Sequence, residues 1–189
     1  LNFFGASNNT YVNTNTWLPV VSGSGSTSRL PDTVEFRFKA ATGSNQVLVR
    51  RGDDWAIRLL DNGSIDNYGR VSFVLSGSEG YIETSSSAFP VFDGEFYSVM
   101  LTRASASGKF LSDDTPSQDV VYSLYTKKYD AGRSKIFLES TATLAVSGSA
   151  GATSESYNAS WTGSGGQITI GGPQENTYFG ESFSGSMME

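Results

Sequence analysis

The residue types that could carry chemistry in this chain are few. Its 189 residues include neither histidine nor cysteine, which removes the Ser-His-Asp and Cys-His arrangements, thiolate chemistry and the metal sites built on either side chain. Any reaction must therefore use carboxylates, Lys, Tyr, Ser, Thr or a metal held by oxygen. The only acidic side chains two residues apart, the spacing that puts both on one face of a strand, are Asp93 and Glu95. Their Asp-Gly-Glu segment predicts a solvated turn, so we expect no catalysis.

Aromatic side chains near loops and strand ends are the clearer binding signal. Sugars stack their CH faces on such rings, and loops commonly carry the binding sites of sandwich scaffolds. The more common use of these rings is to cap the ends of a hydrophobic core. The ligand-binding candidates are Trp55, Tyr68, Trp161 and Tyr178, and Trp17 and Tyr157 are of the same kind.

Charge and composition exclude two classes of partner. The chain has 13 basic and 19 acidic residues, a formal net charge of −6, and no basic stripe, so we expect no nucleic-acid partner. No apolar run approaches the roughly 20 residues of a spanning helix, so we expect no membrane insertion. The length suits one domain, residues 1–189. Because it opens on Leu1, we expect that domain to belong to a longer chain.

Alternating apolar and polar residues predict strands along most of the chain. In the segment 33–40, Val34, Phe36 and Phe38 lie on one face and charged residues on the other. No segment has the apolar spacing of an amphipathic helix. Further strands are predicted at 46–50, 55–59, 70–75, 97–103, 120–127, 135–140, 167–172 and 183–189. About a dozen short strands predict an all-β, antiparallel sandwich, with inward residues Phe36, Phe38, Phe73, Val99, Leu101, Leu124 and Ile170.

Two polar segments predict turns between these strands. Arg51-Gly52-Asp53-Asp54 joins the strands 46–50 and 55–59, and the segment 61–64 contains Asn-Gly, which suits positive φ. The first three residues of the former turn also match the integrin-binding tripeptide. So short a motif arises often by chance, and a plain turn is the favoured interpretation.

Five segments follow one another in an order typical of a known family. They are LNFFG with Tyr11-Val12, VEFRFK at 34–39, DGEFYSVMLTR at 93–103, YSLY at 122–125, and ITIGG at 168–172 followed by 179–189. Together they resemble the laminin-G-like, concanavalin A-like lectin and glucanase domains, over nearly the whole chain. Three positions depart from the family pattern: Phe96 replaces a frequent Trp, Tyr97-Ser98 replaces His-His, and Lys127-Lys128 replaces Asp-Gly.

The resemblance implies a two-sheet jelly-roll sandwich of six or seven strands per sheet, with the opening and closing strands paired. It also includes glucanases, which need two carboxylates about 5–5.5 Å apart in the retaining case. Asp93 and Glu95 lie in a turn that recurs in non-enzymatic relatives, so glycoside hydrolysis ranks last.

Relatives of this kind often hold Ca²⁺ at the rim of the sandwich, through carboxylates and backbone carbonyls. The metal-ligating candidates are Asp53, Asp54 and Asp61, and calcium is the only cofactor that the resemblance implies. Ordinary turn chemistry is the plainer interpretation of the same residues.

The resemblance favours a non-catalytic recognition or adhesion module that is lectin-like and binds carbohydrate or another protein. The alternative is a structural domain, such as a decoration or fibre piece of a virion or surface-layer protein, assembled within a larger particle. Low charge and abundant Ser, Thr and Gly suit that class. Either function places the chain outside the cell, on a cell surface or on a virion, and the fold by itself decides neither.

Overall fold

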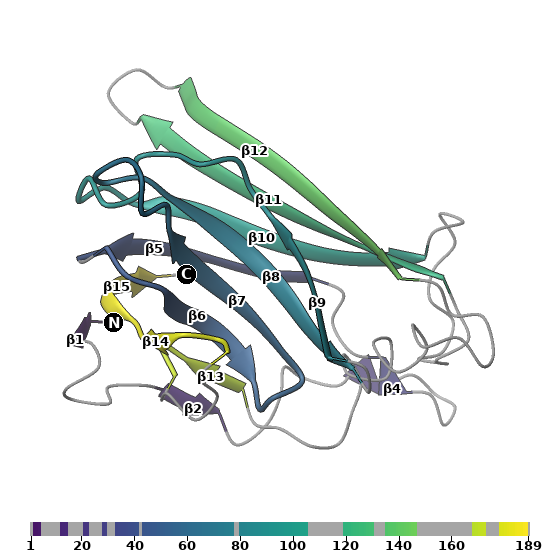
Figure 1. Ribbon diagram of the computed structural model, residues 1–189. Helices are drawn as coiled ribbons and strands as arrows, with labels where there is room; N and C mark the ends of the chain where they lie inside the picture. Colours follow the sequence, from purple (N-terminus) through teal and green to yellow (C-terminus); the bar gives the residue numbers. More distant parts are fainter. Residues whose placement is uncertain are drawn as a thin grey trace.

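The computed structural model describes residues 2–4, 12–14, 21–22, 28–29, 33–41, 43–77, 80–105, 119–130, 135–146, 168–172 and 178–188. Every regular element among them is a β-strand, and the strands form two sheets packed face to face (Figure 1). This confirms the prediction of an all-β, antiparallel sandwich. In the same residues, no helix is long and apolar enough to cross a bilayer.

The first sheet has six strands and includes the strands nearest both chain ends. Its order is β1 (Asn2–Phe4), β15 (Ser184–Met188), β5 (Thr33–Ala40), β10 (Tyr97–Ser105), β11 (Val120–Asp130) and β12 (Lys135–Val146). Every neighbouring pair in it is antiparallel. β1 pairs with β15, as the resemblance implied, and forms one edge of the sheet. The N and C labels of Figure 1 lie close together for this reason.

The second sheet has seven strands and lies in front of the first in Figure 1. Its order is β2 (Val12–Thr14), β13 (Ile168–Ile170), β6 (Gln46–Arg51), β7 (Trp55–Asp61), β8 (Gly69–Gly77) and β9 (Gly80–Ser85), with the short β14 (Glu181–Ser182) parallel to β6. A separate small pair is formed by β3 (Val21–Ser22) and β4 (Ser28–Arg29). β9 was not predicted from the sequence, and β12 runs six residues past the predicted end at Ser140.

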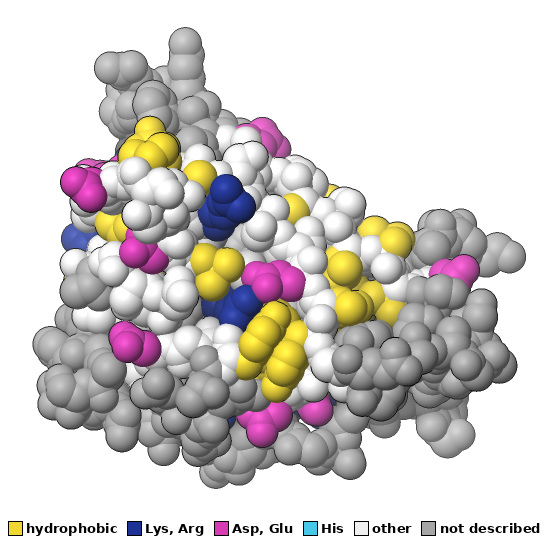
Figure 2. All heavy atoms as spheres, viewed as in Figure 1, with side chains coloured by type: hydrophobic (Ala, Val, Ile, Leu, Met, Phe, Trp, Pro, Cys, Tyr) yellow, Lys and Arg dark blue, Asp and Glu magenta, His cyan; other side chains and the backbone are white. Residues whose placement is uncertain are grey.

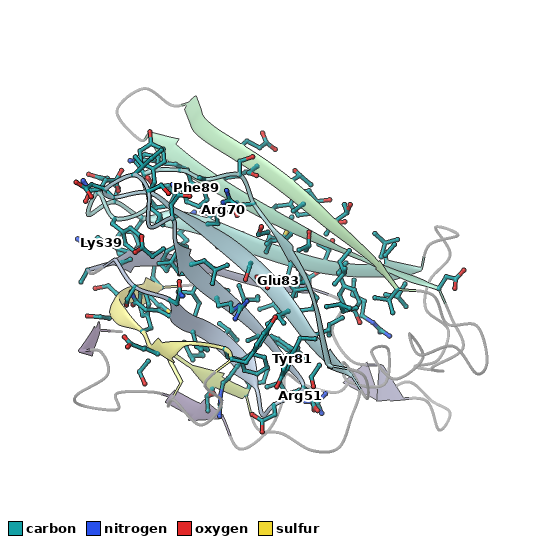
Figure 3. The ribbon with its side chains drawn as sticks, in the orientation of Figure 1. Lys39, Arg51, Arg70, Tyr81, Glu83 and Phe89 are labelled. Atoms are coloured by element: carbon teal, nitrogen blue, oxygen red, sulfur yellow. The ribbon has the colours of Figure 1, made fainter. Side chains whose placement is uncertain are left out.

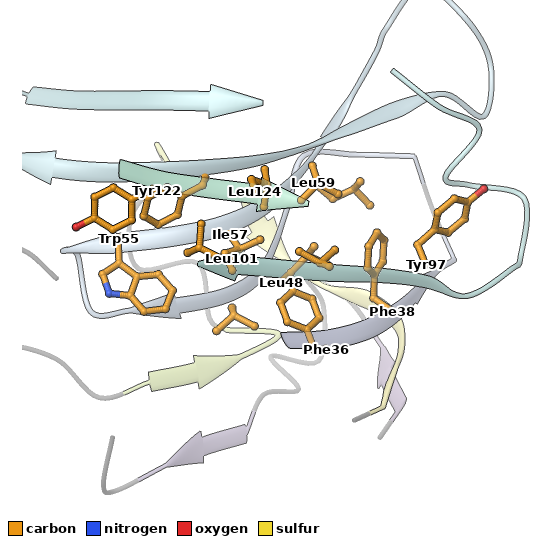
Figure 4. Packing of buried hydrophobic residues seen from close by; sticks show 14 of the residues in the cluster. Phe36, Phe38, Leu48, Trp55, Ile57, Leu59, Tyr97, Leu101, Tyr122 and Leu124 are labelled. Carbon is orange, nitrogen blue, oxygen red and sulfur yellow. The ribbon is translucent and has the colours of Figure 1, made fainter. Parts of the chain in front are cut away.

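The core lies between the two sheets and follows the predicted alternation. On β5, Phe36 and Phe38 are buried while Glu35 and Arg37 are exposed. The other predicted inward residues are also buried, except that Ile170 is partly buried against the cluster. Rings from both sheets meet there: the centroids of Phe73 and Tyr122 are 5.0 Å apart. Figure 4 shows Trp55, from the other sheet, at the same end of the core as Tyr122. Burying each large apolar side chain stabilises the fold by about 1.5–3 kcal/mol.

Hydroxyl groups tie the two sheets together where β9 approaches β12. The Thr84 hydroxyl donates to the Thr143 carbonyl at 3.1 Å. Just beyond β9, the Ser87 amide donates to the Ser140 hydroxyl at 3.0 Å. These bonds close that side of the sandwich and hold β9 in place. The position of β9 matters because its outward side chains form the candidate site.

Candidate functional site

A small apolar cluster covers part of the outer face of the seven-stranded sheet, the face turned away from the core. Ala56 and Val74 belong to it, and each lies between two core residues in its strand, so its side chain points outward. Val47 and the fully buried Phe179 complete the cluster. Phe179 comes from the connection between β13 and β14, so the described end of that connection, at residues 178–180, packs on the outer face of the sheet.

A glycine allows the chain to turn after Phe179. Gly180 has φ of +113°, and a Cβ there would lie 2.9 Å from the carbonyl oxygen of Asn45. Only glycine suits both the positive φ and this close approach. The turn leads straight into β14, which pairs with β6. The backbone around Tyr178 is thereby fixed against the sheet.

Two tyrosines stack on this face beside Phe179. The ring centroids of Tyr81, on β9, and Tyr178 lie 3.9 Å apart with the planes 7° from parallel. Both rings meet Phe179 edge to face, at 5.7 and 6.2 Å. Their exposed fractions are 38% and 41%, large for rings of this size. Figure 2 shows two adjoining hydrophobic side chains on this face, with a basic and an acidic side chain next to them.

Arg58, on β7, connects the tyrosine pair to an acidic group. Its guanidinium carbon lies 4.8 Å from the centroid of the Tyr178 ring, a cation–π distance. Its Nε donates to the Ser72 hydroxyl at 3.1 Å, Nη2 donates to Glu83 Oε2 at 2.7 Å, and Nη1 donates to the Tyr178 carbonyl. All three nitrogens are thus engaged, and only 7% of the residue is exposed. Arg58 locks the rings in place more than it offers itself to a ligand.

We call Tyr81, Tyr178, Arg58 and Glu83 the aromatic platform. Figure 3 shows Tyr81 and Glu83 on the same side of β9, near the middle of the face. The Glu83 side chain is 27% exposed, and a carboxylate accepts several hydrogen bonds, so it keeps acceptor capacity beyond its bond to Arg58. The platform combines flat apolar rings with an acceptor at their border. That combination suits a ligand with CH faces and hydroxyl groups.

The predicted ligand-binding residues that the structure describes do not form one site. Tyr178 is part of the platform. Tyr68 is half-buried in the turn before β8, at the opposite end of that strand from Tyr81, whose partner on β8 is Ser76. Trp161 lies outside the described residues, as do Trp17 and Tyr157.

Trp55 was predicted as a ligand-binding ring, and the structure places it in the core rather than at the aromatic platform. The residue is fully buried, and its ring centroid lies 6.2 Å from that of Phe73 in the core. It follows a turn directly, which suggested a loop-end ring. As the first residue of β7, however, it faces inward with Ile57 and Leu59.

Tyr81 was missed because β9 was missed. Its only local signal is the alternation of Tyr81 and Glu83 with Ile82, which is partly buried against the core. The sequence pattern indicated Arg58 only as a polar residue within the predicted strand 55–59. Its role depends on neighbours from β8, β9 and the β13–β14 connection, which no local pattern reports.

Asp53, Asp54 and Asp61 were predicted as metal ligands, and the structure does not bring the three together. The first two lie in the turn before β7 and the third is its last residue. Seven residues of strand separate the two groups by roughly 20 Å, far too much for one ion. Asp61 instead accepts a hydrogen bond from the Gly63 amide at 3.2 Å. The described residues contain no group of three or more His, Cys, Asp or Glu that could hold a metal.

The Arg51-Gly52-Asp53 tripeptide is a turn, as the favoured interpretation held. The Asp54 amide donates to the Arg51 carbonyl at 2.9 Å and closes it. Arg51 is buried, and burial lowers the pKa of its guanidinium despite the neighbouring Asp54. A buried arginine is not displayed to a receptor.

Asp93 and Glu95 lie in a turn whose bonds are structural. Asp93 Oδ1 accepts the Glu95 amide at 3.0 Å, while Oδ2 lies 2.9 Å from the Tyr97 hydroxyl and also accepts from Lys128 Nζ. Burial opposes ionisation of Asp93, but the hydrogen bonds from Lys128, the Glu95 amide and Tyr97 outweigh it and lower its pKa. A carboxylate held in its charged form by three donors braces the turn and is poorly placed to act as an acid.

Comparison of the chain with protein-family models, with curated proteins and with solved structures finds no match.

Proposed function

We propose that this domain is a non-catalytic recognition module that binds carbohydrate through the aromatic platform. The observation that carries the proposal is the stacked pair Tyr81–Tyr178, exposed on a face that the strands and Phe179 hold rigid. Of the four large hydrophobic side chains exposed among the described residues, two form this pair. Single exposed apolar residues scattered over a surface are ordinary, whereas adjoining ones mark an interaction site. Two adjoining exposed rings on a fixed backbone are therefore typical of a binding surface.

The chemistry of the platform suits a sugar ring. A pyranose can lay its CH face on the outer face of Tyr81, because the Tyr178 ring is covered by Tyr81 and by Arg58. The sugar hydroxyls can then donate to Glu83 or pair with the tyrosine hydroxyls. The rings are already ordered by their contacts with each other, with Phe179 and with Arg58. Binding therefore costs little side-chain entropy, which favours affinity from a small contact area.

The surroundings of Glu83 support binding rather than hydrolysis. Glycoside hydrolysis requires two carboxylates facing one bond. Glu83 is paired with Arg58 at 2.7 Å, and its direct neighbour across the ladder on β8 is Val74. The residues on the same face of β9 two positions away are Tyr81 and Ser85.

A glycan array followed by calorimetric titration of the best ligand tests the proposal. Tyr81→Ala should weaken binding about tenfold, while Tyr81→Phe, which keeps the ring, should retain most of it. Ile65→Ala is the matched control, because Ile65 is another exposed apolar residue but lies in the β7–β8 turn. An array with no ligand at high protein concentration, or equal loss in Tyr81→Ala and Ile65→Ala, would sink the proposal. The assembly alternative would then be tested by the size of the protein in solution.

A further inference from the structure

We infer that the aromatic platform selects uncharged glycans and discriminates against those that carry carboxylate or sulfate groups. The inference rests on the proposed function and adds the class of ligand. A site for an anionic sugar needs a cation whose donors are open to the ligand, and the described part of the platform has its cation committed elsewhere.

That cation is Arg58. Its three nitrogens donate to Ser72, to Glu83 and to the Tyr178 carbonyl, and 93% of the residue is covered. An anionic ligand would have to displace Glu83 from Arg58 and leave a partly buried carboxylate without its partner. Breaking such a pair is costly, so this exchange is unfavourable.

The charge that the platform does expose is negative. Glu83 is the more exposed partner of the ion pair. Glu181 is exposed at the start of β14, three residues after Tyr178. Acidic side chains flank the hydrophobic pair on two sides in Figure 2. Like charges close together repel, and a chain of net charge −6 adds to the effect at low salt.

The other arginines of this sheet do not offset these carboxylates. Arg50 and Arg51, on β6, are both buried. Arg70 is exposed on the same face, but it is six residues from Ser76 along β8, and Ser76 is opposite Tyr81. The separation is roughly 20 Å along the strand. Figure 3 shows Arg70 far from Tyr81, with Glu83 between them.

The test uses matched pairs of oligosaccharides that differ in charge alone. One pair is cellohexaose and its C6-oxidised glucuronate counterpart, and another is a sulfated carrageenan oligosaccharide and the desulfated form of the same oligosaccharide. Binding of both members is titrated at low salt and again at about 0.5 M salt, where the Debye length is only a few ångströms. We expect at least tenfold preference for the neutral member at low salt and a smaller preference at high salt.

Two isosteric variants locate the source of the discrimination. Glu83→Gln keeps an acceptor for Arg58 and should reduce the preference severalfold by improving binding of the charged member. Glu139→Gln is the control, because it changes the net charge equally but lies on β12, where Glu139 pairs with Lys127 in the six-stranded sheet. It should leave the preference unchanged.

The outcomes separate the inference from the proposed function. Charged members that bind as tightly as neutral ones overturn the selectivity and leave carbohydrate binding standing. A preference that persists unchanged in Glu83→Gln, or falls equally in Glu139→Gln, also overturns it. If no member of any pair binds, the proposed function fails and the selectivity fails with it. The salt series on the unaltered protein still tests the selectivity if Glu83→Gln does not fold.

Discussion

Tyr178 stacks on Tyr81 at 3.9 Å although the two residues belong to elements that are far apart in the sequence. Tyr81 is presented by the edge strand β9, and Tyr178 by the connection that precedes β14. The pair therefore exists only when both elements have docked on the same sheet face. Binding by the aromatic platform should be lost as soon as either element detaches, even while the main core remains folded.

Phe179→Ala should destabilise the domain by about 3 kcal/mol or more, because the side chain is fully buried in the outer cluster. The free energy of unfolding from denaturant titration measures this. Tyr178→Ala, the neighbouring and half-exposed ring, is the comparison and should cost less. Equal losses in the two variants would mean that Phe179 does not anchor the connection.

Arg58→Lys should cost about 2 kcal/mol, since an ammonium cannot serve Ser72, Glu83 and the Tyr178 carbonyl together as the guanidinium does. Arg37→Lys, the same exchange at an exposed position of β5, should stay within about 0.5 kcal/mol. Chemical denaturation of both variants decides the matter. A small effect at Arg58 would contradict its role in fixing the aromatic platform.

Gly185→Ala should prevent β15 from pairing normally. A Cβ there would lie 2.0 Å from the Lys39 carbonyl oxygen, and φ is +151°. Gly63→Ala is a suitable control, because Gly63 also has a positive φ, +63°, but no atom lies within 4 Å of the added Cβ. We expect Gly63→Ala to lower the free energy of unfolding by about 1 kcal/mol, and Gly185→Ala to lower it clearly more. The thermal midpoints of the two variants show which is the less stable.

Asp93 should make the domain less stable in acid. Its pKa is lowered in the folded state, so its contribution to stability is complete above the unfolded pKa of about 3.9 and is lost as the pH falls through the folded value. Asp93→Asn should therefore be less stable than the unaltered protein at neutral pH and should lose less on acidification. Unfolding curves across the acid range measure both slopes, and parallel slopes would contradict the prediction.

Asp54 should act with the opposite sign. Burial raises its pKa, against the influence of Arg51, so its contribution to stability is greatest below the unfolded pKa and is lost as the pH rises through the folded value. Asp54→Asn should consequently raise the melting temperature at neutral pH, with the gain vanishing near pH 3. Asp66→Asn, at an exposed position of the β7–β8 turn, is the control and should change little.

The sequence predicted the central strands well because burial between two sheets imposes the alternation itself. Phe36, Phe38 and Leu101 had to share a face, and they do. β9 was missed because it is an edge strand of mostly polar residues, whose stability comes from β8 and from the bond between Thr84 and Thr143. The local sequence pattern contains little information about contacts with residues that are distant in the sequence.

The site was harder to predict than the fold for a related reason. Trp55 and Asp61 are the first and last residues of β7. The direction and length of this strand decide where their side chains lie, and neither follows from a turn motif. The contacts among Arg58, Glu83 and Tyr178 depend on the register of three strands and on one crossing connection. Of the residues of the aromatic platform, Tyr178 alone was predicted, as an aromatic residue near a loop or strand end.

The pairing of β1 with β15 has a mechanical consequence. Asn2 is opposite Ser186 and Phe4 is opposite Ser184, so the first and last strands leave their shared ladder at the same end. A force that pulled the start of β1 away from the end of β15 would break the hydrogen bonds between the two strands one after another. Antiparallel strands loaded in that way part at low force, whereas strands pulled lengthwise must break their bonds together. When the domain is stretched by its two ends, the β1–β15 pair should therefore separate first, before the core between the two sheets unfolds.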